Sequence, residues 1–110
     1  RVVAALGGHT GAWVAERLAA EGVPADVVPL GGETRTCAAI VERGDGTSST
    51  DLYEPATPLS GVEWRDFQDR ALAVVEERMP WVAVSGSLPA GVDPLEAAAM
   101  LERMREAGAR

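Results

Sequence analysis

The stretch Val82-Ala-Val-Ser-Gly-Ser-Leu-Pro-Ala-Gly-Val92 indicates the fold class of this chain. An apolar run leads into small residues and turn formers, and Pro94 then suits the first turn of a helix. In an open α/β sheet, ligands bind at the carboxyl ends of the strands, because strand and helix diverge there. Ser85, Gly86 and Ser87 are therefore candidate site residues, although the same composition also suits a plain turn.

The segments around this stretch predict an α/β domain. A capping box, Ser60-Gly-Val-Glu63, predicts the start of one helix, because the side chains at its two ends satisfy free amides of the first turn. The expected elements are a strand at 2–6, a helix at 11–21 capped by Thr10, a helix at 60–78, a strand at 81–85 and a helix at 93–107.

Three β-like segments without intervening helices interrupt this α/β pattern, at 26–30, 34–41 and 47–53. Asp45-Gly46 predicts a tight hairpin turn between the last two, because type I′ geometry needs positive φ at both central positions. A plain doubly wound domain has no need of three consecutive strands here. The pattern therefore predicts a β-hairpin excursion between two α/β parts.

Apolar residues at helical spacing predict the core. The stripe expected on the helix at 60–78 consists of Trp64, Phe67, Ala71, Leu72 and Val75. The stripe expected on the last helix consists of Leu95, Ala99, Met100 and Met104. Trp13 and Trp81 are also expected to pack in the interior, and Cys37 to be a small buried apolar group.

The charge balance excludes several classes of function. The chain has 110 residues and a net charge of −7, and all of its basic residues are Arg. Without a basic stripe it is not expected to bind nucleic acid, and its charge would repel an anionic membrane. No apolar run approaches the roughly 20 residues that cross a bilayer, and the first residues do not form a signal peptide. An anionic ligand must therefore be held by a local device, such as one well-placed Arg or exposed backbone amides.

Several catalytic classes are excluded by residues that the sequence lacks. One Cys and one His cannot form a zinc cage or an internal disulfide, and a lone thiol suits a reducing cytoplasm. Gly-x-Ser-x-Gly is absent, so a nucleophilic serine is rejected. The turn Gly7-Gly-His-Thr-Gly11 lacks the spacing of a dinucleotide fingerprint, and a chain without Lys has no Walker motif.

Three segments, taken in order, carry a resemblance to a known family. They are Gly7-Gly-His-Thr-Gly11, Gly32-Glu-Thr-Arg-Thr-Cys37 and Ser85-Gly-Ser-Leu-Pro-Ala-Gly-Val92. Together they resemble the PfkB (ribokinase-like) carbohydrate kinases, in particular the branch that phosphorylates phosphosugars, 1-phosphofructokinase and tagatose-6-phosphate kinase. The likeness runs over essentially the whole chain and over only part of such a kinase. Because the first residues look like mid-strand and the last lead toward another strand, we expect an internal fragment.

The resemblance implies a ribokinase-like three-layer α/β sandwich with a small β-strand lid. The whole chain would be one partial domain, with 1–24 and 57–110 in the α/β core and 25–56 in the lid. In this family the lid covers the sugar site, and the lids of two subunits often pair. A homodimer through the lid is therefore expected, since a small isolated flap is only marginally stable.

The same resemblance assigns candidate substrate-binding residues. Arg35 would donate two parallel hydrogen bonds to a substrate phosphate, a role that suits its planar fork; without the resemblance it would be an ordinary surface Arg on an edge strand. Ser87 would lie against the sugar phosphate, Gly86 would let the backbone come near, and Ser85 belongs to the same loop. Glu33 would help to position the substrate.

Two departures from the family pattern bear on the choice of sugar. At the return of the lid, Tyr53 and Ala56 replace the Asn and Gly of the usual Asn-Glu-Pro-Gly motif. Asp51 stands where some 6-phosphofructokinases of the family place a phosphate-binding Arg. An acid there disfavours a second phosphate clamp, which favours conversion of fructose 1-phosphate to fructose 1,6-bisphosphate.

The motif that supplies the catalytic base in this family, Gly-Ala-Gly-Asp, is absent from the sequence. By resemblance, ATP and Mg²⁺ are bound mainly by segments outside these residues, so the isolated 110 residues are expected to be inactive. Two other interpretations stay open. One is a non-catalytic module that dimerises through the lid, and the other is a ribokinase-like sugar or nucleoside kinase whose substrate carries no phosphate.

Overall fold

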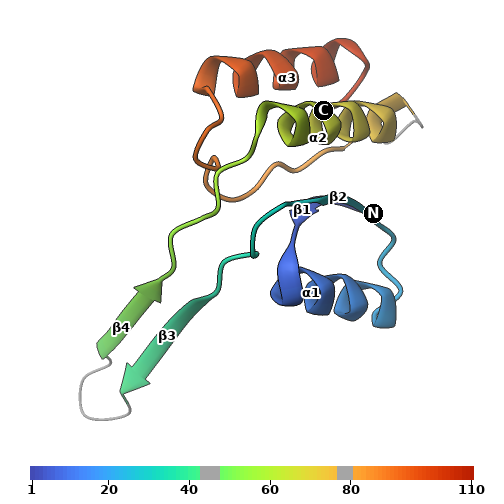
Figure 1. Ribbon diagram of the computed structural model, residues 1–110. Coiled ribbons are helices and arrows are strands. Elements are labelled where there is room, and N and C mark those ends of the chain that lie inside the picture. The colour runs from blue at the N-terminus through green and yellow to red at the C-terminus, as the bar shows by residue number, and fades with distance from the viewer. Residues whose placement is uncertain (43–47, 77–80) are drawn as a thin grey trace.

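The computed structural model describes residues 1–42, 48–76 and 81–110. Two parallel strands, β1 (Val2–Leu6) and β2 (Ala25–Pro29), form the central sheet, with Val2 opposite Ala25 and Leu6 opposite Pro29. Helix α1 (Gly8–Ala20) connects them and covers one face of this sheet. Helix α2 (Gly61–Glu76) packs on the other face, with α3 (Pro94–Glu106) beside it (Figure 1). The described residues therefore form a partial three-layer α/β sandwich, as expected.

The second sheet is an antiparallel hairpin that projects from this core (Figure 1). It consists of β3 (Cys37–Glu42) and β4 (Ser48–Tyr53), with Cys37 opposite Tyr53 and Glu42 opposite Ser48. Within the described residues it contacts no other helix or strand, and every residue of both strands is exposed. The expected turn at Asp45-Gly46 lies outside the described residues.

The expectation of a three-stranded excursion was wrong in one respect. The segment that the sequence analysis grouped with the lid, 26–30, lies in β2 and its end, and β2 pairs with β1 in the central sheet. The physical reason is burial: Val28 of β2 is fully buried, whereas neither face of the hairpin is covered. Only β3 and β4 leave the core.

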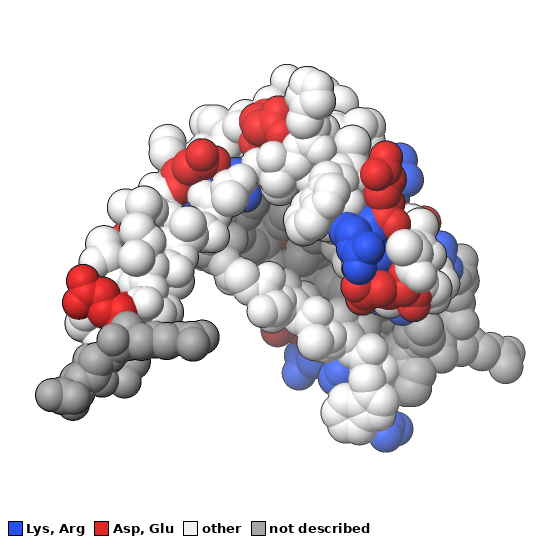
Figure 2. Space-filling model, turned by 90° about the horizontal axis from the view of Figure 1, so that it is seen from below, with Lys and Arg blue, Asp and Glu red and all other residues white. Residues whose placement is uncertain are grey.

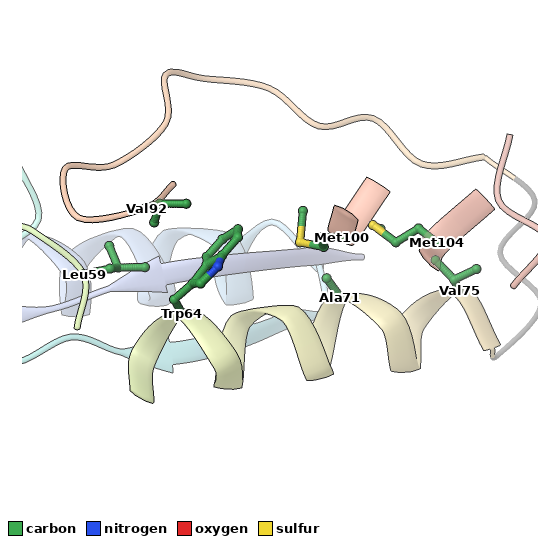
Figure 3. Packing of buried hydrophobic residues seen from close by; sticks show 7 residues of the cluster. All are labelled: Leu59, Trp64, Ala71, Val75, Val92, Met100 and Met104. Carbon is green, nitrogen blue, oxygen red and sulfur yellow. The ribbon is translucent and has the colours of Figure 1, made fainter. Parts of the chain in front are cut away.

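The core lies between α2 and α3 and continues onto the sheet. Figure 3 shows Trp64, Ala71 and Val75 of α2 directed toward Met100 and Met104 of α3. Leu59 and Val92, from the segments that precede the two helices, belong to the same cluster and lie to the left of Trp64 in Figure 3. The ring of Phe67 stacks on Trp64 with 5.6 Å between the centroids. The predicted stripe of α2 is confirmed.

Both helix starts predicted from local caps are confirmed. Ser60 and Glu63 form the reciprocal capping box, with the Ser60 N–H donating to Glu63 Oε2 at 2.7 Å and the Glu63 N–H donating to Ser60 Oγ at 3.3 Å. The Asp93 carboxylate accepts from the Leu95 N–H at 2.8 Å, and Pro94 occupies the first turn. These caps depend on residues within one turn of each other.

The predicted start of α1 was wrong. The helix begins at Gly8 rather than at 11, and Gly7 in the N-cap position provides no side-chain hydrogen bond. Thr10 lies inside the first turn instead of capping it. The reason is that a side chain distant in sequence, Glu33, accepts from the free amides at this end of the helix.

The predicted strand at 81–85 is not formed in this structure. Among the described residues it pairs with no strand, and it lines a cavity of about 340 Å³ together with Val2 and Val3 of β1. The expectation was wrong because a strand needs a neighbouring strand for its ladder of hydrogen bonds. Trp81, predicted to be buried, is 74% exposed. None of the helices in the described part of the chain is both long and apolar enough to cross a membrane.

Three further burial predictions were wrong. Leu95 is 78% exposed and Ala99 is exposed, because α3 turns Ala97, Met100 and Met104 toward the core instead. Trp13 is 61% exposed on α1. Cys37 is exposed, because it lies on the uncovered hairpin.

Candidate functional site

The segment 31–36 leaves the central sheet and carries two of the predicted site residues, Glu33 and Arg35. It begins where the Leu30 N–H donates to the Leu6 carbonyl at 2.9 Å. Thr34 is then fixed to Gly7 twice: its N–H donates to the Gly7 carbonyl and its Oγ1 accepts from the Gly7 N–H, both at 2.9 Å. A side chain at position 7 would collide with the Leu30 carbonyl oxygen, so this close approach requires glycine.

Glu33 caps α1 from outside the helix. Its carboxylate accepts from the Thr10 N–H at 2.6 Å and from the His9 N–H at 3.2 Å. The hydrogen bond from the Thr10 amide is the main cause that holds the pKa of Glu33 below its usual value. Gly8 adopts φ +66, and a side chain there would meet the Glu33 carboxylate. The negative charge of the carboxylate therefore interacts mainly with the positive, N-terminal end of the helix.

Two other carboxylates hold the ends of the same segment. The Gly31 N–H donates to Glu63 Oε1 at 2.8 Å, which links the segment to the first turn of α2. The Thr36 N–H donates to Glu54 Oε2 at 2.8 Å, which links it to the end of the hairpin. The hydrogen bonds to Glu63 from the Ser60 side chain and the Gly31 amide hold the pKa of Glu63 below its usual value.

Arg35 and Ser87 meet although they are far apart in the sequence. Arg35 Nη2 donates to Ser87 Oγ at 3.0 Å, across a sequence separation of 52 residues. The Arg35 side chain is exposed, and within residues 1–42, 48–76 and 81–110 no carboxylate lies within ion-pairing distance of it. Its remaining N–H groups are thus not committed to an ion pair. A guanidinium in this state can bind an anion with charge-assisted hydrogen bonds.

A cavity of about 220 Å³ opens beside this contact. Three of the predicted site residues line it, Glu33, Arg35 and Ser87. The remaining lining is Ala5, Leu30, Thr34, Ala56, Thr57, Leu59 and Pro89. One Arg and three hydroxyl side chains on a partly apolar wall, with the Glu33 carboxylate bonded to the amides of α1, suit a small anionic ligand with a carbon skeleton.

Ser85 and Gly86 lie outside that cavity. They line a neighbouring, largely apolar cavity of about 330 Å³ with Trp64, Phe67 and Met100, and Ser87 is shared between the two. Gly86 has φ +103, a conformation that favours glycine. The structure therefore brings Arg35, Glu33 and Ser87 together and leaves Ser85 and Gly86 one cavity away.

Three residues that shape the site were not among the predicted site residues. Thr57 lines the cavity and donates from Oγ1 to the Glu33 carbonyl at 3.1 Å. Glu54 was noticed only as part of a family motif, and Glu63 only as part of a capping box. Their second bonds, to Thr36 and to Gly31, join segments distant in the sequence, and no local pattern indicates them.

On the face shown in Figure 2, the acidic and basic side chains lie in several groups, with uncharged areas between them.

In the described part of the chain, no three His, Cys, Asp or Glu side chains come close enough together to hold a metal ion.

No protein-family model matches the chain. Solved structures do match it, over 98% of its length. A possible 1-phosphofructokinase from Thermotoga maritima gives a TM-score of 0.85 at 23% sequence identity, with 34% of that chain covered. Phosphofructokinase-2 from Escherichia coli gives 0.80 at 25% identity in its tetrameric inhibited form, with 34% covered. The complex of that enzyme with fructose 6-phosphate gives 0.81 at 23% identity, with 35% covered. The chain has the fold of the phosphofructokinases of the PfkB family, over about a third of their length.

Proposed function

We propose that this chain provides the phosphosugar-binding edge and the lid of an ATP-dependent phosphosugar kinase. The preferred reaction is the conversion of fructose 1-phosphate to fructose 1,6-bisphosphate. The contact between Arg35 and Ser87 carries the proposal, because it joins the two motifs that the resemblance assigns to the substrate, at the edge of one cavity. The proposal covers the whole protein, of which these residues would be one part.

The residues of this chain would bind and orient the substrate. The Arg35 guanidinium would turn from the Ser87 hydroxyl toward the substrate phosphate and donate hydrogen bonds to it. The Ser87 hydroxyl would then donate a hydrogen bond to a phosphate oxygen. Glu33 stands on the cavity wall, but its charge is engaged with the amides of α1, which reduces its repulsion of an anion. In a protein of net charge −7, this arrangement would allow a phosphate to be held locally.

The transfer step would depend on segments outside these residues. The γ-phosphoryl group of ATP would pass to a sugar hydroxyl, the proton of that hydroxyl would go to a base, and ADP would leave. By resemblance, the base, ATP and Mg²⁺ belong to the rest of the kinase. The 110 residues alone should therefore bind substrate without turning it over.

The hairpin would act as the lid and as a dimer contact. Its exposed apolar side chains include Ile40, Val41, Leu52 and Tyr53, each more than half exposed. A two-stranded hairpin with both faces in water is marginally stable, so a second copy of the hairpin is a suitable cover. Sedimentation should show a dimer that Ile40→Asp weakens. A monomer at all concentrations would contradict this part of the proposal.

A substrate panel tests the proposed reaction. The complete polypeptide that contains these residues is assayed with ATP and Mg²⁺ against fructose 1-phosphate, fructose 6-phosphate, tagatose 6-phosphate and fructose. The proposal expects the highest kcat/KM for fructose 1-phosphate and a much lower value for fructose. Equal or faster turnover of fructose would favour a kinase for unphosphorylated sugars. Self-association without any turnover would favour the dimerisation module.

A further inference from the structure

The orientation of the hairpin depends on the two segments that join it to the core. Within the described residues, β3 and β4 contact no other helix or strand. In the part of the chain that the structure describes, the hairpin is therefore held where 31–36 enters it and where 54–60 leaves it. Any residue that fixes this junction fixes the hairpin relative to the core.

Arg35 lies between a residue that is hydrogen-bonded to the core and a residue that is hydrogen-bonded to the end of the hairpin. The residue before it, Thr34, is held to Gly7 of the core by two hydrogen bonds. The residue after it, Thr36, is held to Glu54 at the end of the hairpin. Arg35 is the single residue between these two attachments. A change in the angle of the hairpin must therefore be taken up by the backbone beside its guanidinium.

Glu54 contacts Thr36 through both its backbone and its side chain. The Glu54 N–H donates to the Thr36 carbonyl at 3.3 Å, as expected for the pair that follows Cys37 and Tyr53 in the register. The return bond from the Thr36 N–H goes to the Glu54 carboxylate, at 2.8 Å. Glu54 thus binds the backbone of Thr36 through two groups, its own N–H and its carboxylate. The bond to the carboxylate is the stronger one, because it is charge-assisted.

We infer that Glu54 is a positioning residue that sets Arg35 for the phosphate end of the substrate. The inference rests on the proposed function, in which Arg35 binds the phosphosugar. Glu54 itself touches neither the cavity nor Ser87. It acts by holding Thr36, so that the Arg35 guanidinium stays directed across the cavity. When this bond is lost, Arg35 samples other directions and the phosphosugar binds more weakly.

The test uses the complete polypeptide with three single variants. Glu54→Ala removes the bond, Glu54→Gln keeps an oxygen that can accept it, and Glu42→Ala is the matched control. Glu42 also lies on the hairpin and accepts a hydrogen bond from across it, from Ser48 Oγ at 3.0 Å, but at the end remote from Arg35. We expect Glu54→Ala to raise the KM for the phosphosugar about fivefold, the usual worth of one such bond. The KM for ATP should not change, Glu54→Gln should restore most of the affinity, and Glu42→Ala should have no effect.

A double variant separates positioning from a general structural role. If Glu54 acts through Arg35, then Glu54→Ala should cause little further loss in the Arg35→Ala background. A further fivefold loss in that background would overturn the inference, and so would an unchanged KM in the single Glu54→Ala variant. An equal effect of Glu42→Ala would also overturn it, since any damage to the hairpin would then suffice. If Arg35→Ala alone leaves the phosphosugar KM unchanged, the proposed function itself fails, which is a separate outcome.

Discussion

The two halves of the candidate site are held in different ways. Segment 31–36 is fixed by hydrogen bonds to Gly7 between β1 and α1, to α1, to α2 and to the end of the hairpin. Segment 81–88 makes one backbone hydrogen bond within the described part of the chain, from the Val82 N–H to the Arg110 carbonyl at 3.2 Å. Within the described residues, the first half is therefore fixed at several points and the second by one backbone bond. The contact between Arg35 and Ser87 joins the two halves.

The largest expected effect comes from removing the residue that bridges the halves. Arg35→Ala in the complete polypeptide should weaken phosphosugar binding by about 1.5–3 kcal/mol, because a charge-assisted hydrogen bond to the substrate is lost. Steady-state kinetics would record this as a rise in the phosphosugar KM with the KM for ATP unchanged.

The control for this variant is Arg105→Ala, which removes an exposed arginine paired with Glu102 on α3. It should leave both KM values unchanged. An unaltered phosphosugar KM in Arg35→Ala would indicate a substrate without a phosphate, and the two halves of the site would then have no common ligand.

A smaller effect, on the free energy of unfolding, tests how segment 31–36 is held to α1. Gly8 and Gly22 lie at the start and just beyond the end of α1, with nearly the same backbone angle, φ +66 and +69. Alanine at either position should cost about 1–2 kcal/mol of unfolding free energy for the left-handed conformation. Gly22→Ala meets nothing within 4 Å, whereas Gly8→Ala displaces the carboxylate of Glu33.

Gly8→Ala should therefore destabilise the 110-residue protein more than Gly22→Ala does, in urea denaturation followed by circular dichroism. Equal losses of unfolding free energy in the two variants would mean that the cap of α1 by Glu33 adds nothing to the stability of the protein.

The smallest expected effect is a dependence of stability on pH. The folded protein lowers the pKa of Glu33 and of Glu63 from a usual value near 4.5. The unfolded chain therefore takes up protons first as the pH falls, so the stabilisation that these two carboxylates contribute is fully present above this value and declines below it. Thermal unfolding between pH 7 and pH 3 should show this decline, and Glu33→Gln should make it shallower. A profile that is the same in Glu33→Gln would show that the carboxylate is not engaged with α1.

Local signals in the sequence predicted a part of this architecture well. The caps at Ser60 and Asp93 bind amides within three residues, so a short motif contains all the information needed to place them. The start of α1 could not be found in this way, because its cap is Glu33, more than 20 residues away. The strand expected at 81–85 requires a neighbouring strand, and sequence pattern alone cannot provide one.

For the candidate site, too, contacts between residues distant in the sequence could not be predicted from local motifs. The family motifs directed attention to Arg35 and Ser87, which the structure brings into contact, and their role in binding a substrate stays a prediction. They did not reveal that Glu33 faces the amides of α1, or that Glu54 holds the residue after Arg35. Both interactions depend on how the chain returns from the hairpin and passes the first turn of α1, which becomes visible only in three dimensions.

The most direct test of the account is a crystal structure of the complete polypeptide with fructose 1-phosphate. The account predicts that Arg35 and Ser87 both lie within about 3.2 Å of the oxygens of the substrate phosphate, which is hydrogen-bonding distance. A phosphate bound elsewhere, with Arg35 still bonded to Ser87 alone, would contradict it.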